Sequence, residues 1–88
     1  VMTTNREIEK EIQDRTGLTG VRVSKAQGMC RFYSDNDISV DLSLTDAVYV
    51  PRLSDMSVAD WADTLEWELK ETGQWDAVKR VVIGGGLK

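Results

Sequence analysis

Residues 57–72 carry the pattern that most limits how this chain can fold, because they predict one helix with a single apolar stripe. At 100° per residue, the apolar side chains of this segment gather within a sector of about 100°. They are Val58, Trp61, Ala62, Leu65 and Leu69. A stripe of this width must be covered by another apolar surface, and the inner face of a β-sheet is a suitable one. The segment therefore predicts a helix packed on a sheet.

The ends of this helix are marked by residues that favour helix termini. Ser57 is a good N-cap, and Asp60 places an acid in the first turn, where the helix dipole favours negative charge. Gly73 is placed to end the helix in a left-handed turn. The predicted boundaries are therefore close to residues 57 and 72.

A second helix is predicted near the N-terminus. Thr4 and Glu7 form a capping-box pattern, in which the glutamate reaches back to the amide of the N-cap residue. Ile8 and Ile12 lie four residues apart on one face, and Gly17 can end the helix. Two isoleucines make a thin stripe, so we expect this helix to be lightly anchored or to be anchored by another subunit.

Three or four strands are predicted between the helices. Residues 21–25 alternate between apolar and polar side chains, and residues 29–34 follow after a short turn. Residues 38–44 alternate four aliphatic side chains with polar ones, so one face of that strand is expected to be buried. Residues 47–50 are either a fourth strand or the continuation of the third, and Pro51 ends them. The short gaps predict an antiparallel meander.

The end of the sequence predicts one more strand and a tail. Residues 78–83 are rich in β-branched side chains and favour a strand, and the glycine-rich residues 84–88 favour a flexible tail. We therefore expect one α+β domain over residues 1–88, with an ordered core at 3–83. Its two layers would be formed by a helix, a three- or four-stranded antiparallel meander, a second helix and a C-terminal strand.

The predicted order of helix, three strands and helix resembles that of double-stranded-RNA-binding domains, and the resemblance is limited to this order. Those domains present lysines at the start of their second helix to the RNA phosphates. Here the corresponding turns carry Asp55, Asp60 and Asp63, and no lysine precedes Lys70. Carboxylates repel a phosphate backbone, so direct binding to nucleic acid is not expected.

The residue types that are missing narrow the chemistry. The chain has no histidine and one cysteine, Cys30, so a Ser-His-Asp or Cys-His arrangement cannot be built within it. Zinc sites made of cysteine and histidine are excluded for the same reason. We therefore expect no enzyme activity, no cofactor and no metal, and we interpret Cys30 as a small buried apolar residue.

The same inspection suggests where the protein works. No apolar run approaches the ~20 residues of a membrane span, and no leader of a charged segment followed by an apolar one begins the sequence. Together with the lone cysteine, this leads us to expect a cytoplasmic protein that does not bind a membrane.

Negative charge is concentrated in one part of the sequence. The net charge of the chain is −4, whereas residues 35–76 alone hold eleven acids against Arg52 and Lys70. On the predicted helix, Asp60, Asp63 and Glu71 lie on the side away from the apolar stripe. A basic partner would be attracted to such a surface.

Trp67 lies in the middle of this acidic surface. It is 180° from Val58 around the predicted helix, directly opposite the apolar stripe. Buried tryptophans often contribute more than about 2 kcal/mol to an interface. The alternatives are that the segment around Trp75 covers the indole, or that the indole is simply exposed. The candidate partner-binding residues are Asp60, Asp63, Trp67 and Glu71.

The sequence therefore favours a small acidic protein-interaction module. Its expected partner is a protein with a basic, nucleic-acid-binding surface, contacted through the acidic face of the 57–72 helix. Phages and mobile elements encode small acidic inhibitors and accessory factors of this type, and the analogy depends on size and charge. The alternative is a homo-oligomeric structural or assembly protein, such as a homodimer, that has no ligand chemistry.

Overall fold

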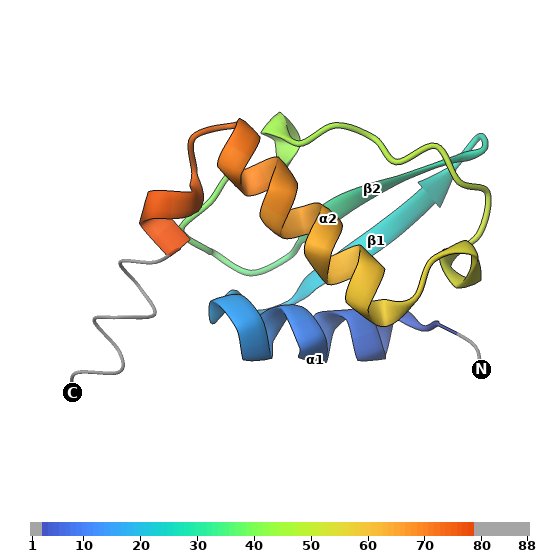
Figure 1. Ribbon diagram of the computed structural model, residues 1–88, viewed down its shortest axis with the longest axis horizontal. Helices are drawn as coiled ribbons and strands as arrows, with labels where there is room; N and C mark the ends of the chain where they lie inside the picture. The colour runs from blue at the N-terminus through green and yellow to red at the C-terminus, as the bar shows by residue number, and fades with distance from the viewer. Residues whose placement is uncertain (1–2, 79–88) are drawn as a thin grey trace.

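A computed structural model describes residues 3–78 and shows two helices on one side of a two-stranded antiparallel hairpin (Figure 1). The order is α1 (Asn5–Thr16), β1 (Val21–Ala26), β2 (Met29–Ser34) and α2 (Val58–Glu71). Two short 3₁₀ turns, η1 (Leu42–Leu44) and η2 (Leu53–Asp55), lie between β2 and α2. The predicted α+β class is confirmed.

The first helix begins and ends where the sequence predicts. The hydroxyl of Thr4 accepts a hydrogen bond from the N–H of Glu7, and Gly17 follows the helix with a φ of 77°. The Glu7 carboxylate accepts from the Thr4 hydroxyl at 3.1 Å, not from the Thr4 amide as predicted. Ile8 and Ile12 are 0% exposed. Their burial anchors α1 in the core of its own chain, so this face is not available to another subunit.

The hairpin owes its shape to a tight turn and an alternating pattern. Gln27 and Gly28 have φ angles of 54° and 79°, and positive φ at both central residues is typical of the type I′ turn that joins two strands. Alternate side chains of the strands are buried below the helices: Val21, Val23, Cys30 and Phe32. The opposite face of the hairpin is exposed at Arg22, Ser24, Arg31 and Tyr33.

The second helix has the predicted apolar stripe. Its N-cap is Ser57, whose hydroxyl accepts from the N–H of Asp60 at 3.1 Å. At the C-terminal end, Gln74 N–H donates to Leu69 C=O and Gly73 N–H donates to Lys70 C=O, the pair of bonds found in a Schellman motif. The stripe residues Trp61, Ala62, Leu65 and Leu69 are buried.

Trp61 lies at the centre of the core. Its ring meets Phe32 of β2 edge to face, with centroids 5.9 Å apart and an interplanar angle of 85°. Its indole N–H donates to the C=O of Leu53 at 2.9 Å, so the buried ring has no unsatisfied donor. Trp61 therefore joins α2, β2 and η2.

The third strand predicted at residues 38–44 is not found: the sheet of the described residues has two strands. The alternation is preserved only in part: Val40 and Leu42 are buried while Asp41 and Ser43 are exposed, but Leu44 is 56% exposed. The segment is nevertheless irregular and ends in η1. The three-strand order shared with double-stranded-RNA-binding domains is therefore not observed.

Local and side-chain hydrogen bonds explain why residues 38–44 do not join the sheet. The carboxylate of Asp41 accepts from the N–H and the hydroxyl of Ser43, which starts η1 in place of a strand. The side-chain amide of Gln74 accepts from the N–H of Asp41 at 2.6 Å and donates to its C=O at 3.0 Å. Asp41 thus pairs with a side chain that follows the C-terminal end of α2, and not with β2.

The other two strand predictions also need correction. Of residues 47–50, only Val48 pairs with the sheet, in a single antiparallel bridge to Cys30. Val78, the first residue of the strand predicted at 78–83, closes a helical turn at residues 75–78. The rest of that strand and the predicted tail at 84–88 lie outside the described residues.

Cys30 has the environment predicted for it. The side chain is 0% exposed, and its thiol donates to the C=O of Val50 at 3.3 Å. Burial raises the pKa of the Cys30 thiol, because the thiolate would lose its hydration. This is the environment of a structural cysteine.

Ser43→Ala is expected to raise the pKa of Asp41. The hydroxyl and then the N–H of Ser43 hold this pKa below its ordinary value of 3.8, and the variant removes the larger of the two effects. A carboxyl with a lowered pKa stabilises the folded state at pH values above its ordinary pKa. This contribution is lost as the pH falls through the folded-state pKa. An NMR titration of the Asp41 carboxyl carbon in both proteins measures the change. Equal pKa values would show that the Ser43 hydroxyl has no such effect.

Candidate functional site

The outward side of α2 presents a tryptophan between carboxylates. Trp67 is 57% exposed, although the other tryptophan of this helix, Trp61, is 0% exposed. Asp60 and Glu71 are exposed on the same side, one turn or two from Trp67. We call Asp60, Trp67 and Glu71 the outer face of α2. The structure therefore brings three of the four predicted residues together on one surface.

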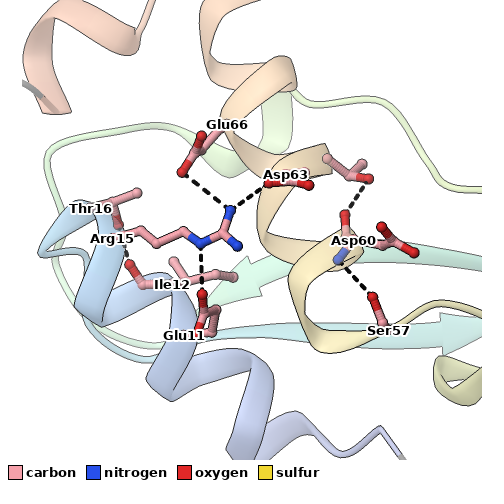
Figure 2. Close-up of polar contacts among 9 residues, drawn as sticks. Glu11, Ile12, Arg15, Thr16, Ser57, Asp60, Asp63 and Glu66 are labelled. Atoms are coloured by element: carbon pink, nitrogen blue, oxygen red, sulfur yellow. Dashed lines mark hydrogen bonds and ion pairs between the residues drawn. The ribbon is translucent and has the colours of Figure 1, made fainter.

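The fourth predicted residue, Asp63, belongs to a contact between the helices. Figure 2 shows Asp63 and Glu66 of α2 directed at the guanidinium of Arg15 on α1. The Arg15 Nη1 atom lies 2.5 Å from Asp63 Oδ1 and 3.6 Å from Glu66 Oε1, and its Nε donates to Glu11 Oε2 at 2.7 Å. The Arg15 guanidinium thus forms ion pairs with three carboxylates, and the charge of Asp63 is partly neutralised.

The charges of this cluster stabilise one another. The hydrogen bond with Asp63, followed by that with Glu11, raises the pKa of Arg15, which keeps the guanidinium charged. Asp63 is 65% exposed, so water screens its attraction to Arg15, and the pair contributes little to stability. Its main effect is on charge: the single positive charge of Arg15 offsets part of the negative charge on the α1 side of α2.

Among the described residues, Asp60 and Glu71 have no ion-pair partner within 4.0 Å. The N–H and C=O groups of Asp60 bond to Ser57 and Thr64, whereas its carboxylate receives no hydrogen bond from residues 3–78. These two carboxylates are therefore the ones that keep their full charge beside Trp67.

Glu68, on the other side of α2, is buried for a structural reason. It is 6% exposed, and its Oε1 accepts from the N–H of Asp46 at 2.8 Å. This bond ties the segment after η1 to α2. Glu68 therefore adds a carboxylate to the acidic helix in the sequence, but not to its exposed surface.

Lys70 interacts with Trp75 and not with Trp67. Its Nζ lies 4.9 Å from the centroid of the Trp75 ring, a distance typical of a cation–π contact. Trp75 itself packs against the core as a partly buried residue. Trp75, which the sequence suggested as cover for Trp67, is thus engaged with the core and with Lys70.

Sequence reasoning missed the cluster at Arg15 and the burial of Glu68. The Glu11–Arg15 spacing of four residues was a readable sign of an ion pair on the helix. The contact with Asp63 joins residues 48 apart, and it depends on how α1 packs against α2. No local pattern in the sequence could reveal that contact.

Two further observations concern residues 3–78. No three carboxylate or thiol groups among them come together as the ligands of a metal ion would. None of their helices has the length and apolar composition needed to cross a bilayer.

No protein-family model matches the sequence, and no curated protein or solved structure matches it significantly. The outer face of α2 therefore has to be interpreted from its own chemistry.

Proposed function

We propose that this protein is a small interaction module that binds a basic protein surface through the outer face of α2. The partner class we favour is a nucleic-acid-binding protein, and the module would act as an inhibitor or accessory factor of the type found in phages and mobile elements. The proposal assigns no catalytic chemistry to the chain. It places the complex in the cytoplasm, where a lone reduced cysteine such as Cys30 is usual.

The observation that carries the proposal is the exposure of Trp67. Its ring, 57% exposed, is a large apolar surface in contact with water. Burying such a ring in a partner removes that surface from water and loses little side-chain entropy, since tryptophan has only two rotatable side-chain bonds. Tryptophan is enriched among the residues that dominate binding energy.

The charge around the ring supports a basic partner. Among residues 3–78, no cation forms an ion pair with the carboxylates of Asp60 and Glu71, so none of these residues competes with a lysine or arginine of a partner. Complementary charge at the rim of an interface speeds association and fixes orientation. Trp67 would supply most of the affinity, and the two carboxylates would supply specificity.

The same ring also raises the alternative of a homodimer, which light scattering over a range of protein concentrations would detect. A twofold interface on the outer face would place Asp60 and Glu71 of each copy against an identical acidic surface. Like charges brought together in this way repel one another. The charge of the face therefore favours a basic partner over a second copy.

Trp67→Ala is expected to weaken binding by about 30-fold or more, the factor that corresponds to ~2 kcal/mol. Proteins retained from a cell lysate by the immobilised wild type would first be compared with those retained by Trp67→Ala. The partner lost on substitution would then be purified and titrated against both proteins. Tyr49→Ala is the matched control, because Tyr49 is 77% exposed and follows Val48, which pairs with β2.

The charge of the face is tested by Glu71→Lys. Glu71 lies at the end of α2, where a cation suits the helix dipole better than an acid, so the substitution is expected to maintain or raise stability while it weakens binding. Asp14→Lys makes the same change of charge in the last turn of α1 and is expected to leave binding unchanged. The proposal would be contradicted if Tyr49→Ala or Asp14→Lys weakened binding as much as Trp67→Ala or Glu71→Lys. A partner with an acidic binding surface would also contradict it.

A further inference from the structure

The hairpin and α2 carry charges of opposite sign. Residues 21–34, which form the hairpin, include three bases and no acid. α2 includes five acids and one base, Lys70. Figure 1 shows α2 in front of the hairpin, so the outer face of α2 and the far side of the hairpin point in opposite directions. The two layers thus give the molecule an acidic side and a basic side.

The side of the hairpin that faces away from the helices has the composition of an interface. Tyr49 belongs to this side, because Val48 pairs with β2, Val48 and Val50 pack against the core, and the residue between them points the opposite way. Tyr33 is 36% exposed and Tyr49 is 77% exposed. Tyrosine, methionine and arginine are enriched in protein interfaces. We call the following six residues the outer face of the hairpin: Arg22, Ser24, Met29, Arg31, Tyr33 and Tyr49.

Arg31 is the base of this face that can bind a further carboxylate. Arg22 already donates to Glu9 Oε1 at 2.9 Å. Among residues 3–78, no carboxylate forms an ion pair with Arg31. Its Nη2 donates to the C=O of Thr45 at 3.2 Å, which uses one of the several N–H groups of the guanidinium. Arg31 therefore keeps donors for the carboxylates of another molecule.

Two acids limit where such a contact can lie. Asp37 and Asp41 line a hollow together with Arg31 and Tyr33 beside β2. They repel other carboxylates, so an acidic surface that reaches Arg31 has to extend toward the turn of the hairpin. The outer-face residue next to the turn is Met29, which has no charge.

The outer face of α2 is complementary to this surface. Trp67 is 57% exposed and lies on the same side of α2 as Asp60 and Glu71. The face of a tryptophan ring attracts a guanidinium, and carboxylates beside the ring can accept its N–H groups. A tryptophan with carboxylates around it thus matches an arginine that has methionine and tyrosine around it.

We propose that the outer face of α2 binds the outer face of the hairpin of a second copy of this chain. Because the two faces lie on opposite sides of the molecule, each contact leaves one face of each kind free, and further copies can add head to tail. The hairpin is then covered by helices on both sides, its own on one side and the α2 of its neighbour on the other. The inference rests on the proposed function in one respect, that the outer face of α2 is a binding surface, and a second copy competes with the basic partner for it.

Twofold contacts fit these surfaces less well. Two copies that meet through α2 bring the carboxylates of Asp60 and Glu71 against those of the other copy. Two copies that meet through the hairpin bring one Arg31 against the other. Only the contact between unlike faces avoids both repulsions.

Sedimentation equilibrium of the full chain tests this inference, from micromolar to millimolar concentration and at low ionic strength, where charges are screened least. The average mass of the wild type is expected to rise with concentration and to pass twice the 9.9 kDa of one chain. Trp67→Ala and Arg31→Glu are each expected to raise the apparent dissociation constant about 30-fold or more. Circular dichroism verifies that both variants are folded.

An equimolar mixture of these two variants distinguishes a head-to-tail contact from a twofold one. Trp67→Ala keeps its hairpin face and Arg31→Glu keeps its α2 face, so one contact of the proposed kind can form between them. The mass of the mixture is expected to rise to that of a dimer and to stop there. In a twofold contact through α2, every mixed pair would contain one altered face, and mixing would not restore the wild-type affinity.

Arg6→Glu is the matched control for Arg31→Glu. Arg6 is exposed in the first turn of α1, where the helix dipole favours an acid, and it belongs to neither face. The substitution is expected to leave self-association unchanged. Tyr49→Ala, which leaves the outer face of α2 intact, is expected to weaken self-association but not the binding of the basic partner.

The inference fails if the wild type keeps the mass of one chain at every concentration, or if its mass levels off at that of a dimer. It also fails if the mixture of Trp67→Ala and Arg31→Glu stays monomeric, or if Arg6→Glu has the same effect as Arg31→Glu. None of these results contradicts the proposed function, because the binding of a basic partner depends on Trp67 and not on Arg31.

Discussion

Trp61→Ala is expected to lower the free energy of unfolding by about 3–5 kcal/mol. The ring is 0% exposed, meets Phe32 edge to face and donates to Leu53, so the substitution opens a cavity and leaves a carbonyl without its donor. At roughly 0.05–0.15 kcal/mol per residue, a chain of 88 residues has about 4–13 kcal/mol in total. Urea denaturation followed by circular dichroism measures the loss, which is a large part of this total.

Two further variants separate the causes of this effect. Trp61→Phe keeps an aromatic ring near Phe32 and loses the bond to Leu53, so we expect a smaller loss than for alanine. Trp67→Ala removes an exposed ring, and its effect on stability is expected to stay within about 0.5 kcal/mol. Equal losses for Trp61→Ala and Trp67→Ala would contradict the arrangement of α2 described above.

Ile12→Ala is expected to cost about 2–5 kcal/mol of the free energy of unfolding. Ile12 is 0% exposed in the core, where α1 packs against β1 and α2. Since this core belongs to one chain, the loss is expected to be the same at every protein concentration. Thermal or urea denaturation at several protein concentrations measures the loss of free energy and shows whether it depends on concentration.

Ile12→Val is the graded control for this substitution, with an expected cost of about 0.5–1.5 kcal/mol. The sequence left open whether the thin stripe of α1 is anchored by another subunit. That alternative would be favoured if the midpoint of unfolding of the wild type rises with protein concentration and the midpoint of Ile12→Ala does not.

The helices and the hairpin were predictable because their signals are local. Thr4 and Gly17 mark the ends of α1, and Ser57 and Gly73 mark those of α2, each through contacts within a few residues. The turn at Gln27–Gly28 works in the same way. Side chains four residues apart or less decide these features, so a single sequence contains the information.

The third strand was predicted wrongly because a distant residue decides its conformation. Residues 38–44 have the alternation of a half-buried strand, and Val40 and Leu42 are buried as expected. Gln74, 33 residues further along, occupies the N–H and C=O of Asp41. The periodicity of a sequence indicates which side chains are buried. It does not indicate which groups form hydrogen bonds with the backbone N–H and C=O.

The candidate site was also predictable only where its features are local. The helical wheel places Trp67 opposite the core, and the ring is exposed. The wheel could not show that Asp63 faces Arg15, because this contact depends on the packing of two helices. The sequence thus predicts the position of the outer face but not how much of its charge remains.

The hold of Gln74 on Asp41 also has a consequence for the order of folding. The hairpin and α2 close short loops, whereas the Gln74–Asp41 contact joins residues 33 apart and needs the C-terminal end of α2 to be formed first. We therefore expect residues 36–43 to settle late, after the hairpin and α2 have met. Until then Val40 and Leu42, which are buried in the folded protein, remain exposed, and chains that meet at this stage can associate through them.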